Sequence, residues 1–196
     1  MLRADLHIHT CFSPDSEVSP ERLVAKCIDV GLDCIAVTDH NTIEGALAVR
    51  ELAPFTVIVG EEVRSTQGEV TGLFLHEAVP PDLLPVETAR RIKDQGGLVS
   101  LPHPFDRFRS HVIDASALDD LLPYVDIVEA FNARNNVGAD DRKAEELARR
   151  HGLLTSAVSD AHTAFELGRT YNEIPEFDGT GQDFKRALAQ GRRITR

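Results

Sequence analysis

Two short stretches at opposite ends of the chain place metal-binding side chains two residues apart. Residues 5–10 (DLHIHT) alternate as a β-strand does, and every second side chain of a strand lies on one face, so His7 and His9 point the same way. Residues 159–162 (SDAH) repeat the spacing with a carboxylate and an imidazole. Histidine pairs supported by a carboxylate suit Zn, Mn or Fe better than Ca or Mg. A fold that joins the two stretches would therefore create a transition-metal site.

The elements that must position these groups are short apolar runs alternating with amphipathic helical patterns. This rhythm indicates a parallel sheet with helices outside it. Besides the first strand, the expected strands cover residues 34–38, 56–59, 70–75, 98–101, 126–131 and 153–159. The expected helices lie between Ser19 and Gly31 and over residues 41–53, 86–95, 116–122, 140–151 and 182–190.

Candidate ligands stand at the C-terminal ends of six of these strands. They are His9, His40, Glu62, His103, Asn132 and Asp160. A closed barrel gathers the C-terminal ends of all its strands around one mouth, whereas an open doubly wound sheet uses them mainly at a switch point. The spread over six strands favours an α/β barrel.

Composition sets broad limits on function. The chain has 196 residues, 42% hydrophobic and 27% charged, with a formal charge of −11. Stable nucleic-acid binding, which usually needs a basic face, is not expected. The three cysteines form no C-x-x-C pair, so a disulfide framework is not expected either. We find no signal-like segment and no apolar run of membrane-spanning length, and we expect a soluble cytoplasmic protein.

Together these stretches resemble the successive motifs of the PHP (polymerase and histidinol phosphatase) domain. The motifs are residues 5–10, 38–41 (TDHN), 60–62 (GEE), 102–104 (PHP) and 159–162. The resemblance implies one metal-dependent hydrolase domain over residues 1–196, in which residues 126–196 resemble the PHP-associated C-terminal region of small stand-alone members. It also implies a distorted seven-stranded β/α (TIM-like) barrel with two or three divalent metal ions (Mn, Fe or Zn) and phosphoesterase activity.

The resemblance also assigns ligands to each ion. These are His7, His9 and Asp160 for the first, a bridging Glu62 with His103 for the second, and Asp15, His40 and His162 for the third. Glu61 is expected on the other face of its strand. The chain departs from the fuller motif set at Thr71, where other members carry a histidine that binds the second metal.

Such a centre favours hydrolysis of a phosphate ester of a small metabolite or nucleotide. We expect metal-bound hydroxide to attack phosphorus, with Asp160 at the catalytic centre and His40 or His162 relaying a proton. Three arginines near the expected mouth could clamp the phosphate in fork geometry, although surface arginines often only solvate loops. They are Arg107, Arg109 and Arg134.

Two other readings remain open. The same barrel could hydrolyse an amide as an amidohydrolase-like enzyme, which would prefer an uncharged substrate and tolerate loss of the arginines. It could also be a non-catalytic PHP-like module, although such modules tend to lose ligands that this chain keeps. The residues do not identify the substrate, the metal, the group that replaces the histidine at position 71, or the oligomeric state.

Overall fold

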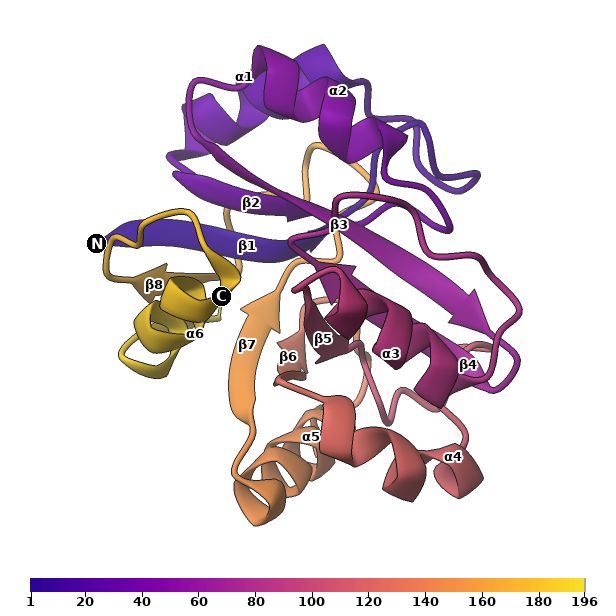
Figure 1. The fold of residues 1–196 in the computed structure, drawn as a ribbon. Coiled ribbons are helices and arrows are strands. Elements are labelled where there is room, and N and C mark those ends of the chain that lie inside the picture. Colours follow the sequence, from indigo (N-terminus) through magenta and orange to yellow (C-terminus); the bar gives the residue numbers. More distant parts are fainter. Residues whose placement is uncertain (196) are drawn as a thin grey trace.

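Within residues 1–195, the sheet contains nine strands and curves until its ends approach each other (Figure 1). The computed structural model describes residues 1–195. The strands are β1 (Leu2–Ile8), β2 (Cys34–Val37), β3 (Thr56–Ser65), β4 (Gly68–Leu73), β5 (Leu98–Leu101), β6 (Ile127–Asn132), β7 (Leu154–Val158), β8 (Tyr171–Ile174) and β9 (Arg192–Ile194). Their order is β7-β6-β5-β4-β3-β2-β1-β8-β9. The expected α/β barrel-like fold is confirmed, with nine strands instead of seven.

The seam of the barrel lies where the two ends of the chain meet. The first half of β1 pairs antiparallel with β8, whereas the end of β1 bridges to the segment after β7 through His9 N and Ala161 O, 2.9 Å apart. Between these contacts, the Asn172 amide donates to Ala4 O (3.0 Å) and Ala157 O (2.9 Å) and accepts from Ala157 N (2.9 Å). One buried side chain thus replaces main-chain pairing that the seam lacks.

The alternating pattern predicted a parallel sheet, but the sheet is not parallel throughout. β4 pairs antiparallel with both β3 and β5, with Glu62 opposite Thr71. Only residues 66–67 separate β3 from β4, and so short a link makes a hairpin, because a parallel crossover needs a dozen residues or more. Gly68, with φ of 112°, enters β4 in a conformation that favours glycine.

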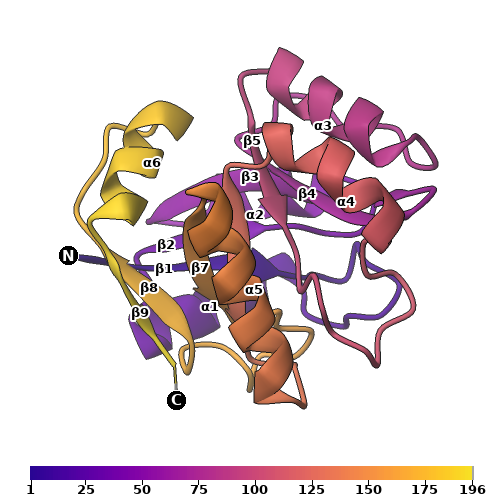
Figure 2. The same cartoon turned by 90° about the horizontal axis from the view of Figure 1, so that it is seen from below.

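Helices cover the outside of this sheet (Figures 1 and 2). They are α1 (Pro20–Val30), α2 (Glu44–Leu52), α3 (Pro85–Asp94), α4 (Ala115–Leu121), α5 (Gly138–His151) and α6 (Gly181–Ala189), and a 3₁₀ turn (Leu122–Tyr124) follows α4. Ser19 caps α1 by accepting from Arg22 N, and Gly31 ends it with φ of 72°, as expected. α2 begins later than expected because Asn41 has φ of 56° and its side chain accepts from Arg64 N.

Packing fixes the strand ends that carry the site. All four residues of β2 are buried, as is typical of a parallel strand between two others. The helices bury their apolar stripes on this sheet, for example through Leu23 of α1 and Ile92 of α3. In residues 1–195, none of the helices is both long enough and apolar enough to cross a membrane.

Candidate metal centre

β1 delivers the first pair of ligands. His7 lies in the strand and His9 just beyond it; both are fully buried, and their Nε2 atoms are 3.0 Å apart. His7 Nδ1 lies 2.6 Å from Glu129 Oε1, and His9 Nδ1 lies 3.1 Å from Ser13 Oγ. Protons on both Nδ1 atoms satisfy these contacts, which leaves the two Nε2 lone pairs facing each other. A proton or a metal ion is required between them.

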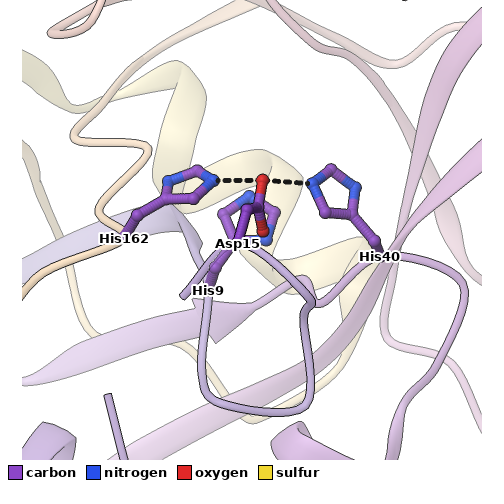
Figure 3. A group of neighbouring side chains, drawn as sticks. All are labelled: His9, Asp15, His40 and His162. Carbon is purple, nitrogen blue, oxygen red and sulfur yellow. Dashed lines mark hydrogen bonds and ion pairs between the residues drawn. The ribbon is translucent and has the colours of Figure 1, made fainter. Parts of the chain in front are cut away.

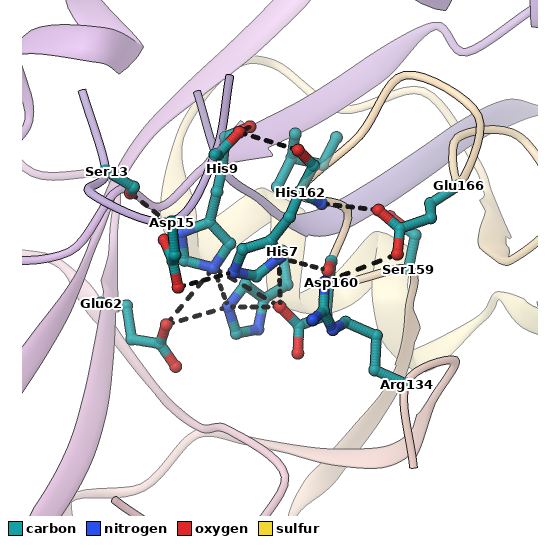
Figure 4. A network of polar contacts seen from close by, with 12 residues as sticks. His7, His9, Ser13, Asp15, Glu62, Arg134, Ser159, Asp160, His162 and Glu166 are labelled. Atoms are coloured by element: carbon teal, nitrogen blue, oxygen red, sulfur yellow. Dashed lines mark hydrogen bonds and ion pairs between the residues drawn. The ribbon is translucent and has the colours of Figure 1, made fainter. Parts of the chain in front are cut away.

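Asp160 completes this group from the end of β7 (Figure 4). Its Oδ1 lies 3.6 Å from His7 Nε2 and 3.5 Å from His9 Nε2, and it is buried without a hydrogen-bond partner. Its Oδ2 accepts from Asn132 Nδ2 at 3.0 Å and from Arg109. Asp160 has φ of 52°, a strained conformation that is common at functional sites. An unpartnered carboxylate oxygen beside two imidazole lone pairs fits a divalent metal ion.

Glu62 joins the first group to a second one. Its Oε2 lies 3.2 Å from His7 Nε2, and its Oε1 lies 3.0 Å from His103 Nε2. His103 follows β5, and its main-chain N donates to Glu129 Oε2 at 2.9 Å. One carboxylate therefore faces ligands of two groups, which is the geometry expected of a bridging glutamate. Glu129 lies behind His7 and orients its ring, as supporting carboxylates do in metal sites.

A third group, drawn in Figure 3, is less buried than the first, because Asp15 is exposed and His40 is partly exposed. Asp15 Oδ2 lies 3.3 Å from His40 Nε2 and 3.1 Å from His162 Nε2, and ligand atoms of these residues and His9 lie within 4.8 Å of one another. Asp39 holds the loop that carries Asp15. It accepts from Thr10 N, Thr10 Oγ1 and Ser13 Oγ at 2.7, 2.6 and 2.7 Å, so it orients the loop and does not face the centre.

The electrostatics of the cluster call for a cation at its centre. Burial opposes charge on every member, yet the neighbouring histidines hold the pKa of Glu62 and the pKa of Asp160 well below their usual values. Burial lowers the pKa of His7, but Glu129, Glu62 and Asp160 reverse this, so the net shift is well upward. The buried carboxylates stay ionised only beside positive charge, which bound divalent ions supply.

Comparison with known proteins places the chain in a family. The family model described as PHP domain matches residues 5–118, and the model described as PHP-associated matches residues 138–192. The chain belongs to the PHP domain family. A relative, the uncharacterized protein MJ1587 of Methanocaldococcus jannaschii, is 38% identical over 152 residues, which are 70% of this chain and 85% of that protein.

Solved structures share the PHP fold. A two-domain protein of Bacteroides vulgatus, described as containing a predicted PHP-like metal-dependent phosphoesterase, has a TM-score of 0.77 and 20% identity, covering 99% of this chain and 64% of its own. Endonuclease Q, in complex with a 27-mer duplex substrate that has an abasic lesion at the active site, has a TM-score of 0.72 and 16% identity, covering 98% and 58%. This chain thus spans less than two thirds of either protein, and the likeness shows the fold alone.

The three arginines differ in their surroundings. Arg109 and Arg134 line a pocket of 340 Å³ at the mouth of the barrel, together with His40 and His162. Arg109 also pairs with Asp160 and with Asp106 (3.1 Å). Arg134 lies 3.5 Å from Glu166. Arg107 instead forms a two-pronged pair with Asp140 of α5, at 3.0 and 2.7 Å, and does not line this pocket.

Sequence reasoning missed six residues of the pocket, among them Glu69, Phe108 and His111. Glu69 of β4 is 6% exposed, and burial together with the neighbouring Glu62 carboxylate raises its pKa to about 9. Its signal in the sequence was its place two residues before Thr71, which puts both side chains on one face of β4. Phe108 and His111 lie in the loop after β5, where no periodic pattern marks them.

Proposed function

We propose that this protein is a metal-dependent phosphoesterase that hydrolyses a phosphate ester of a small metabolite or nucleotide. The observation that carries the proposal is the unpartnered Asp160 Oδ1, buried beside two imidazole Nε2 atoms at the mouth of a PHP barrel. Histidine and carboxylate groups converge there from both ends of the chain and from the strands between them. This ligand set supports two or three divalent ions.

Divalent ions, when bound, act as Lewis acids that polarise the phosphoryl group and activate water for attack on phosphorus. In the proposed reaction, His7, His9, Asp160, Glu62 and His103 hold the buried ions. His40 and His162 face the pocket and move a proton towards the leaving group. Burial lowers the pKa of His162, and the neighbouring His9 lowers it further, so His162 is mostly neutral near pH 7, and a proton that it receives is readily passed on.

The side chains that line the pocket would bind the substrate. Its volume of 340 Å³ suits a small phosphorylated compound. Arg134 and Arg109 offer guanidinium groups to phosphate oxygens, and Arg109 can do so beside the Asp160 carboxylate that it contacts. Arg107 contributes less, because Asp140 already occupies both prongs of its guanidinium.

Duplex DNA is a second candidate substrate because endonuclease Q shares this fold. The resemblance runs against the expectation that the protein avoids nucleic acid. The formal charge of −11 opposes tight binding of a polyanion, whereas bound divalent ions would offset the charge locally. The small substrate is favoured because Arg109 and Arg134 offer positive charge to one phosphate group at the pocket, whereas the acidic chain opposes a long polyanion.

Activity should be tested with protein stripped of metal and reloaded with Mn²⁺, Fe²⁺ or Zn²⁺. The panel comprises an aryl phosphate, nucleotides, sugar phosphates, an anilide and a duplex with an abasic lesion. We expect release of phosphate from a small ester, lost by more than about 100-fold in His9→Ala and Asp160→Ala. Cleavage of the duplex alone would favour the nuclease, and cleavage of the anilide alone an amidohydrolase. A folded, metal-loaded protein that turns over none of them would refute the proposal.

A further inference from the structure

Position 71 of β4 is where this chain lacks a ligand for the second metal. Thr71 lies opposite Glu62 in the β3–β4 pair, so its side chain shares the ladder position of the bridging carboxylate. The Thr71 side chain is buried, and its hydroxyl has no hydrogen-bond partner. A threonine hydroxyl is short and neutral, which makes it a poor substitute for imidazole in binding a divalent ion.

Glu69 lies on the same face of the same strand and reaches the site. Its Oε2 is 3.9 Å from His103 Nε2, and its Oε1 is 3.8 Å from His40 Nδ1. Its side chain is only 8% exposed and borders the pocket that His40 and His162 also line. Burying a carboxylate is costly unless a positive charge lies close to it. The group is placed to receive a cation.

The spacing of the atoms fits a common ion. Two atoms that each lie about 2.1 Å from one metal can be at most about 4.2 Å apart. His103 Nε2 lies 3.0 Å from Glu62 Oε1 and 3.9 Å from Glu69 Oε2, both within that limit, and ligand atoms of Glu69, Glu62 and His40 lie within 4.8 Å of one another. We propose that Glu69 supplies the ligand to the second metal that position 71 does not.

The replacement changes the chemistry of the centre. A carboxylate adds a negative charge where an imidazole would be neutral, and it presents a harder donor atom. Oxygen donors suit Mn²⁺, whereas imidazole suits Zn²⁺ and Fe²⁺. The second site of this chain should therefore prefer Mn²⁺ over Zn²⁺ more strongly than a site with histidine at position 71. The inference concerns metal binding and does not depend on which ester is hydrolysed.

The test compares metal binding of the full-length wild type, Glu69→Gln and the double variant Glu69→Gln/Thr71→His. Each is stripped with chelator and titrated with MnCl₂ or ZnCl₂ by calorimetry, and retained metal is counted by mass spectrometry after desalting. We expect Glu69→Gln to lose one Mn²⁺ equivalent or to bind it at least about tenfold more weakly, as direct ligands matter more than their supports. The double variant should regain an equivalent, now with Zn²⁺ preferred over Mn²⁺.

The matched control is Glu61→Gln, the same change at a buried glutamate on the opposite face of β3, where Oε2 accepts from Val79 N at 2.7 Å. It should keep every equivalent. Circular dichroism checks that each variant is folded. If Glu69→Gln does not fold, Glu69→Ala is titrated in its place. Unchanged stoichiometry and affinity in a folded Glu69 variant would overturn the proposal, as would an equal loss in Glu61→Gln. Both results are independent of turnover, so they separate this inference from the proposed activity.

Discussion

Glu61 and Glu62 are adjacent, yet the structure gives them opposite surroundings, and Glu61→Gln tests that difference. The Glu61 carboxyl is fully buried away from the metal centre; Oε2 accepts from Val79 N, and Oε1 has no partner. Burial raises the pKa of Glu61 from 4.5 to about 7, although the Val79 N–H lowers it in part. Glutamine has nearly the same shape and cannot ionise, so it removes the titration and keeps the bond from Val79.

The raised pKa of Glu61 makes stability fall as pH rises. Between pH 4.5 and about 7 the native carboxyl keeps a proton that the unfolded one has lost, so the native state binds more protons. The stabilisation is complete below 4.5 and is lost by about 7. Raising the pKa from 4.5 to about 7 corresponds to about 3.4 kcal/mol, of which about 2.5 kcal/mol falls between pH 5 and 8.

The assay is urea unfolding of metal-free protein, followed by circular dichroism at several values between pH 5 and 8. The free energy of unfolding of Glu61→Gln minus that of the wild type should rise by about 2.5 kcal/mol over this range. The matched control is Glu51→Gln on the exposed face of α2, where the same substitution removes no buried carboxyl. A difference for Glu61→Gln that is constant, or that falls as pH rises, would refute the assignment of a buried protonated carboxyl.

Three further predictions follow from the seam, the loop and the pocket. Asn172→Ala should lower the free energy of unfolding by about 3 kcal/mol in urea, because it leaves buried main-chain groups without partners; a loss below about 1 kcal/mol would contradict this. Gly45→Ala should weaken Mn²⁺ binding measured by calorimetry, because a Cβ there would lie 1.9 Å from Asp39 Oδ2 and displace the loop that Asp39 holds; unchanged affinity would count against that role. In the small-ester assay, Arg134→Ala should raise KM about tenfold and Arg107→Ala less, and the reverse order would exclude Arg134 as the phosphate clamp.

Local alternation made part of the site predictable. His7 and His9 are two residues apart on one strand, so their shared face follows from strand geometry whatever surrounds them. The same alternation predicted that the Glu61 and Glu62 side chains lie on opposite faces of the strand, and the structure confirms this prediction. Once a barrel was inferred, the C-terminal ends of the strands were expected to meet at one mouth. These conclusions depend on neighbours along the chain, which a sequence displays directly.

Contacts across strands were harder to foresee. The antiparallel setting of β4 depends on a two-residue link, and the place of Glu69 depends on that register, which the sequence does not display. Arg107 and Arg109 look alike in sequence, but α5 brings Asp140 to the first and β7 brings Asp160 to the second. β8 and β9 have four and three residues, too few to show an apolar period.

The seam of the barrel and the first metal group occupy the same place, and this explains why ligands come from both ends of the chain. β1 and the segment after β7 meet through the His9–Ala161 bond and through Asp5, which accepts from Ser159 N across 154 positions in sequence. Together with the three hydrogen bonds of Asn172, these contacts offset the entropy that is lost when so long a loop closes. An ion held by His7, His9 and Asp160 would tie the two edges together and shape the mouth at once. Metal binding and barrel closure should therefore stabilise each other in this family member.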